Sequence, residues 1–213
     1  NGDFVDISGI VGMTELNGNR YKVANVSTYT FELTDEETGD DIDGTGFEAY
    51  ESGAEIRKCF NTFSGLDHLE GLSVVALANG NVMPAQVVSG GDITFSRKYS
   101  RIHAGLAYTS DFETLNVEAG MKDGTMQGRP VKISEVTFRL LNTRGGYIGP
   151  DSDHLYEAFT PTRLSLGQAP ELFSGDTTEP LGAGYEQGGR IFYRQVDPLP
   201  VTITAVIPKV MVY

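Results

Sequence analysis

Short runs of alternating apolar and polar residues, separated by glycine-rich turns, constrain the fold of this chain more than any other feature. The clearest runs cover residues 29–33 and 131–141. Side chains along a β-strand point alternately to opposite faces, so each run can bury one face of a sheet. The 26 glycines, and the tight-turn sequence at 17–19, supply the reversals between strands. We therefore predict an all-β protein, with helical turns only at 66–70 and 111–115.

The spacing of the expected strands divides the 213 residues into two domains. Residues 1–62 contain five or six short strands, a spacing typical of a small β-barrel. Residues 63–213 contain longer strands and a stretch at 150–189 that is rich in proline, glycine, aspartate and threonine. A stretch of that length is usually an interaction surface or a surface loop. For this second domain we predict an antiparallel β-sandwich-like fold with long loops.

The charge of the chain limits its partners. It has 16 basic and 29 acidic residues, a net charge of −13, and residues 1–65 hold 13 of the acidic residues against 4 basic ones. Long-lived binding to nucleic acid requires clustered Lys and Arg, so this composition argues against it, and against anionic membrane surfaces. No apolar run approaches the roughly 20 residues of a membrane helix. We expect no membrane anchor.

Six acidic residues gather in one loop: Asp35, Glu36, Glu37, Asp40, Asp41 and Asp43. With Gly44 taken as the sixth position of an EF-hand calcium loop, Gly39 and Tyr50 occupy its first and twelfth positions. Those two positions should carry the strongest calcium ligands, so the match to an EF-hand loop fails there. We expect a solvated turn, with a weak divalent-ion site as the alternative, and we predict no metal and no cofactor.

No group of residues predicts an enzyme. His68, His103 and His154 are not at metal-ligand spacing, and His68 is expected to be structural although carboxylates flank it. The single cysteine, Cys59, is expected to be a half-buried strand residue. A glycosidase with two carboxylates far apart in sequence stays open as a third hypothesis. We predict a non-enzymatic protein without catalytic residues.

Several blocks of sequence, in a fixed order, resemble the tail nozzle proteins (tail tubular protein B) of podoviruses. The first block is Leu66, Asp67, His68, Leu69, Glu70 and Gly71. It is followed by blocks at 74–80, 88–95 and 103–110, and later by blocks at 127–129, 136–141 and 145–150. The first domain is similar to the FCCH domain, a small β-barrel of ubiquitin-activating enzymes, through residues 11–18, 31–33 and 50–53. No adenylation site or thioester cysteine accompanies it, so the similarity implies the fold alone.

The nozzle resemblance implies a structural protein of the virion tail, made in the host cytoplasm, that forms part of the channel for DNA ejection. It implies a ring of copies, as a hexamer, with other tail proteins such as the adaptor as partners and transient contact with DNA. The six acidic residues then become candidates to line the channel.

Four apolar residues in the long stretch are interface candidates: Phe159, Leu164, Leu172 and Phe173. Their other expected role is to cover the core of their own domain. The alternative function is a tail or fibre module that recognises a host surface glycan. Its candidate platforms are the tyrosines at 108, 147, 156 and 185.

Overall fold

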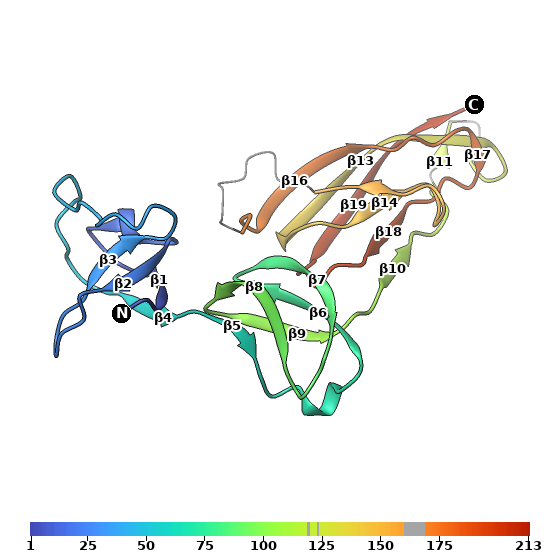
Figure 1. Cartoon of the computed structure of the whole chain (residues 1–213). Helices are drawn as coiled ribbons and strands as arrows, with labels where there is room; N and C mark the ends of the chain where they lie inside the picture. Colours follow the sequence, from blue (N-terminus) through green and yellow to red (C-terminus); the bar gives the residue numbers. More distant parts are fainter. Residues whose placement is uncertain (119, 123, 160–168) are drawn as a thin grey trace. The chain divides into compact units, whose positions relative to one another are not determined.

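The computed structural model describes residues 1–118, 120–122, 124–159 and 169–213, and it contains strands in antiparallel sheets (Figure 1). Among these residues the only helices are two single 3-10 turns, η1 (Thr14–Leu16) and η2 (Asp67–Leu69). The all-β prediction is confirmed. The described chain forms two compact units, which divide after Leu106.

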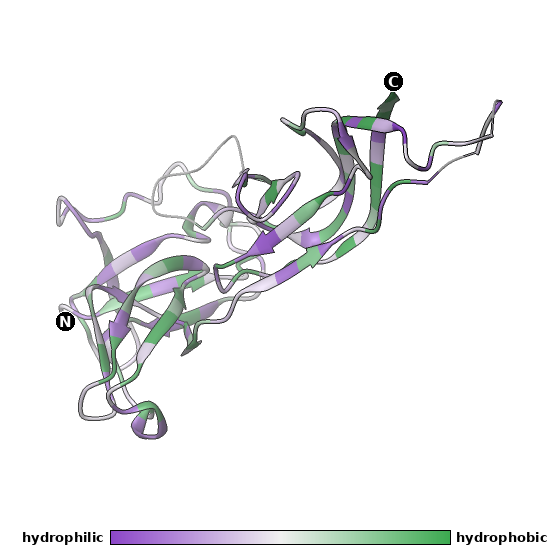
Figure 2. Cartoon of the chain, turned by 90° about the vertical axis from the view of Figure 1, so that its right-hand side faces the viewer, coloured by the Kyte–Doolittle hydropathy of each residue, from purple (hydrophilic) through white to green (hydrophobic). Residues whose placement is uncertain are grey.

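Residues 1–58, here called the first module, form a four-stranded sheet. Its strands are β1 (Phe4–Ser8), β2 (Arg20–Ala24), β3 (Glu32–Asp35) and β4 (Glu55–Lys58), in the order β3-β2-β1-β4. Apolar and polar residues alternate along strands of this kind (Figure 2). The inward-facing residues form a small core of Val5, Ile7, Ile10, Tyr21 and Val23.

The predicted barrel is not closed in the described residues. β3 and β4 are the two edges of the sheet, and the segment between them makes only the isolated bridges Thr34↔Asp41 and Val11↔Ser52. That segment contains four glycines and no long apolar alternation, so it does not sustain the ladder that would join the edges.

Residues 60–106, here called the middle module, belong to the same compact unit but have their own core. β5 (Phe60–Phe63) pairs with β8 (Ile93–Tyr99), and β6 (Ser73–Ala78) lies between β7 (Asn81–Val87) and β9 (Ile102–Leu106). The core consists of Val74, Ala76, Val88, Ile93 and Phe95. Two cores thus lie on either side of residue 62, although the compact units divide only after Leu106.

The second unit, here called the sandwich unit, contains two main sheets. In one, the long strand β13 (Pro130–Thr143) pairs with β16 (Phe173–Pro180), β17 (Glu186–Gln187) and β19 (Ile203–Val212). In the other, the order is β10 (Ser110–Glu113), β18 (Phe192–Gln195), β14 (Tyr147–Gly149), β15 (Tyr156–Glu157). A two-stranded hairpin of β11 (Gly120–Met121) and β12 (Gly124–Thr125) stands apart from both.

One core joins the two sheets of the sandwich unit. Val136 and Phe138 of β13 contribute from one sheet, and Ile148 of β14 and Tyr193 of β18 contribute from the other. All four are at most 3% exposed. The rings of Phe138 and Tyr193 also contact Phe159, edge-on and stacked respectively. This two-layer packing is the sandwich-like arrangement expected from the sequence.

Candidate functional site

The acidic loop at 35–43 is a hydrogen-bonded turn that follows β3. The carboxylate of Asp35 accepts hydrogen bonds from the backbone N–H groups of Glu37 and Thr38, each 2.8 Å long, and Asp43 accepts one from Thr45. These backbone donors hold the pKa of both aspartates below its usual value. Both aspartates are therefore used to shape the turn.

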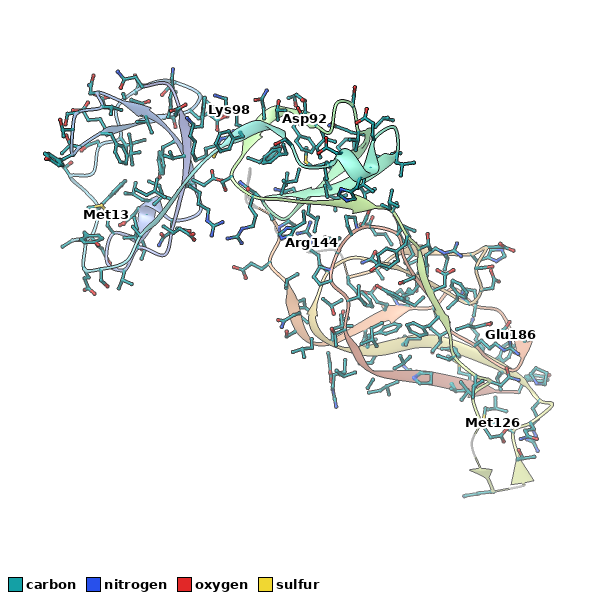
Figure 3. The ribbon with its side chains drawn as sticks, turned by 90° about the horizontal axis from the view of Figure 1, so that it is seen from below. Met13, Asp92, Lys98, Met126, Arg144 and Glu186 are labelled. Atoms are coloured by element: carbon teal, nitrogen blue, oxygen red, sulfur yellow. The ribbon has the colours of Figure 1, made fainter. Side chains whose placement is uncertain are left out.

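Glu36 contributes to the packing between the first and middle modules. Its carboxylate pairs with Arg20 of β2 and lies 3.6 Å from Arg97 of β8. Arg20 also donates to the carbonyl of Lys98, whose ammonium lies 4.7 Å from the ring centroid of Phe4. Lys98 is seen where the first and middle modules meet (Figure 3). Glu36 thus helps to hold these modules together.

Three residues of the acidic loop stay exposed without such a role: Glu37, Asp40 and Asp41. Among the described residues, no group of three His, Cys, Asp or Glu side chains could hold a metal ion. The loop therefore offers a surface of negative charge, carried mainly by these three carboxylates.

The block Leu66, Asp67, His68, Leu69, Glu70 and Gly71 is folded around η2. Leu66 and Leu69 pack on the core of the middle module. The Glu70 carboxylate accepts hydrogen bonds from the N–H groups of Gly91, at 2.8 Å, and Gly90, at 3.0 Å, which lower the pKa of Glu70. The block thereby closes over the turn between β7 and β8. It is a structural element of this module.

Two of the three blocks that resemble the FCCH domain meet in space. Val11 accepts a hydrogen bond from the N–H of Glu51 and donates one to Ser52, so residues 11–18 lie beside residues 50–53. Gly12 has a φ of +93°, and a Cβ there would overlap the carbonyl oxygen of Ala49. Only glycine permits this close approach.

The four interface candidates have different environments. Phe159 is 9% exposed and packs in the core of its own unit, so it is not available to a neighbour as it stands. Leu172 and Phe173 are 47% and 46% exposed and remain candidates. Leu164 lies outside the described residues.

The connection between β2 and β3 forms an exposed apolar feature that the sequence did not reveal. Residues 29–33 were expected to form one strand, but β3 starts at Glu32. Val26, Tyr29 and Phe31, here called the aromatic tip, are 53%, 95% and 40% exposed. The signal available in the sequence was the absence of charge from residue 24 to residue 31 within an acidic module.

A groove of about 360 Å³ opens in the sandwich unit beside Tyr108. Phe112, Leu199, Val201 and Ile203 give it apolar walls. Polar residues also line it: Ser110, Asp111, Gln195 and Asp197. Because β10 and β19 belong to different sheets, sequence reasoning could not bring these residues together. We call it the Tyr108 groove.

Among the residues that the structure describes, His154 and Cys59 form no further site. His154 is exposed and its Nδ1 lies 2.9 Å from Asp151, with which it forms an ion pair when protonated. Cys59 is 2% exposed, more buried than expected, and burial raises the pKa of its thiol to about 12. A thiol with such a pKa is not a nucleophile at neutral pH.

Comparison with known protein families identifies the class of the first module. The model of the ubiquitin-activating enzyme E1 FCCH domain matches residues 1–57. The chain thus begins with an FCCH-like domain, as the sequence blocks predicted. No curated protein matches the chain significantly.

No helix among the described residues has the length and apolar composition needed to cross a membrane.

Proposed function

We propose that this chain is a structural component of a bacteriophage tail, in which it forms part of the nozzle or tail tube through which DNA is ejected. One observation carries the proposal. The first three blocks that resemble nozzle proteins fold into one module with one core, and Glu70 of the first block accepts hydrogen bonds from the glycine turn of the third. An FCCH-like domain precedes them in the chain.

In this proposal the acidic loop faces the DNA channel. Like charges repel, and at physiological salt the interaction falls off over about 8 Å, so only wall residues close to the duplex matter. Glu37, Asp40 and Asp41 are exposed and suit this role. They would keep DNA from adhering to the wall as it passes.

The proposal also assigns partners and location. The chain acts in the virion tail after synthesis in the host cytoplasm. It forms a hexameric ring with other copies of itself, contacts other tail proteins such as the adaptor, and touches DNA only in transit. It acts as a non-enzymatic part of the channel.

The test replaces the exposed acidic residues without disturbing the turn. Glu37→Gln, Asp40→Asn and Asp41→Asn together remove three charges and leave Asp35, Glu36 and Asp43 in place. We expect slower DNA ejection from the mutant particles in a single-particle fluorescence assay. A control with Asp153→Asn, Glu157→Gln and Glu171→Gln changes the net charge equally at exposed positions of the sandwich unit. Equal ejection rates in wild type and loop mutant would rule out lumen lining.

A second candidate is a module that binds a host surface glycan. The observation that favours it is Tyr108, which is 78% exposed and lines a groove with carboxylate and amide groups on its rim. Tyr185 is also exposed, whereas Tyr147 and Tyr156 are half-buried and offer less ring surface. A glycan array without hits would remove this candidate.

A further inference from the structure

The aromatic tip is held in one conformation although its apolar side chains face solvent. Ser27 and Thr30 are joined by a backbone hydrogen bond of 2.8 Å and by a hydrogen bond of 2.7 Å between their hydroxyls. The N–H of Val26 donates to the Asn1 side chain at 2.9 Å. A contact made by a preorganised turn loses little conformational entropy on binding. The tip therefore has the properties of a binding element.

The Tyr108 groove has the complementary properties. Part of its wall is apolar, through Phe112 of β10, Ile203 of β19 and Val201 just before β19, and polar residues form the rest of the lining. Its volume of about 360 Å³ suits an aromatic side chain with its neighbours. The rim supplies acceptors for a phenol hydroxyl, and a buried tyrosine usually finds such a partner.

The distribution of charge over the surface favours contact between copies at these two places. A chain with a net charge of −13 repels itself over most of its surface. The tip has no charged residue from 24 to 31. At the groove, Asp111 is neutralised by a two-pronged pair with Arg194, at 2.8 and 2.9 Å, and Asp197 lies close enough to Arg144 for attraction. Both surfaces are locally neutral.

We propose that the aromatic tip of one copy docks in the Tyr108 groove of a second copy of this chain. The two surfaces differ, so the contact is heterologous, and repetition of a heterologous contact closes into a ring when the rotation permits. The inference rests on the proposed function because it supplies the subunit contact that a tail ring requires.

Disulfide trapping tests the contact in the full-length chain. Thr28→Cys combined with Ser110→Cys keeps Tyr29 in place and puts one thiol on the turn that carries the tip and one in the groove lining, both at exposed positions. Native Cys59 is 2% exposed and will not compete. Under mild oxidation we expect covalent dimers and higher species on a non-reducing gel. A control pair, Thr45→Cys with Ser110→Cys, places the first thiol on the exposed loop that follows the acidic residues and should stay monomeric.

A second measurement uses changes that remove the contact. Tyr29→Ser should lower the oligomeric fraction in light scattering at least tenfold at equal concentration, and Thr28→Ser, on the same turn, should leave it unchanged. The proposal is overturned by absence of cross-links, by cross-links confined to single chains, or by a monomeric wild type. Binding of a glycan that depends on Tyr108, with no self-association, would also overturn it. Failure of this contact leaves the proposed function standing if immunogold labelling still places the chain in the tail.

Discussion

At the scale of single residues, two close approaches in the sandwich unit depend on side-chain identity. Tyr193 is 3% exposed, and its hydroxyl donates to the carbonyl of Gly145 at 3.2 Å. Burial raises the pKa of Tyr193 to about 12. The next residue, Gly146, has a φ of +118°, and a Cβ there would overlap the Tyr193 ring. The turn and the ring therefore require each other.

Gly146→Ala should destabilise the sandwich unit by about 3 kcal/mol, because it adds backbone strain and displaces a core ring. Gly182→Ala is the matched control, since a Cβ there meets nothing within 4 Å. Urea unfolding followed by tyrosine fluorescence measures both. Equal midpoints for the two variants would contradict the packing described.

Cys59 provides a test based on pH. The pKa of its thiol is raised to about 12 in the folded chain, from a usual value of 9.0. The folded state therefore favours the protonated thiol, and this contribution to stability is present below pH 9 and is lost as pH rises toward 12. We expect Cys59→Ser to lose less stability between pH 8 and 11 than the wild type does. The native thiol should react with Ellman's reagent at pH 8 only after unfolding, and rapid labelling of the folded chain would contradict its burial.

At the scale of elements, the sequence predicted those strands whose alternation matches one buried face. β13 is the clearest case, since its apolar positions are buried as the pattern required. They are Val131, Ile133, Val136, Phe138 and Leu140. The alternation at 29–33 was a wrong guide to the strand, because Tyr29 and Phe31 belong to none of the three cores and the strand register starts only at Glu32. β16 was missed because its sequence, rich in threonine, glycine and acidic residues, has almost no apolar period. It is a strand because β13 supplies its pairing partner.

β19 is an edge strand of the β13 sheet in the described chain, and Pro208 lies in its middle. The N–H of Tyr213 donates to Pro130, so by alternation the position of Pro208 faces the open edge. Proline removes a donor from that edge and discourages strand addition. Pro208→Val should increase concentration-dependent aggregation in light scattering. Ala205→Val, whose N–H faces β13, should not, and a soluble Pro208→Val variant would contradict the role.

The ion pair and the backbone hydrogen bond of Arg20 should stabilise the first module against local unfolding. The Arg20 side chain is 12% exposed and binds Glu36 and the carbonyl of Lys98. Arg20→Met leaves that carbonyl without its donor, and we expect a loss of about 2 kcal/mol. Hydrogen exchange should then quicken in β1 and β2, whereas Lys22→Met on the exposed side of β2 should have little effect. Unchanged protection in the Arg20 variant would show that these contacts do not hold the module.

At the scale of the whole molecule, the sequence predicted the class of fold and one domain, but not the surfaces for contact. The FCCH-like blocks are local in sequence and were visible directly. The Tyr108 groove joins residues 108–112 to residues 193–203, and only the folded sandwich brings them together. The acidic loop was found from composition alone. Some carboxylates of this loop are structural because they bind Arg20, Thr38 and Thr45, and the others are exposed. The charge pattern of the sequence did not reveal those contacts.

Electron cryo-microscopy of the particle that carries this chain would show whether the chain forms part of a phage tail. We predict a ring of all-β subunits around the tail channel, with the acidic loops toward the lumen and each aromatic tip against the groove of the next copy. A tail reconstruction without this subunit, or one that shows it as separate copies on fibres away from the channel, would contradict the account.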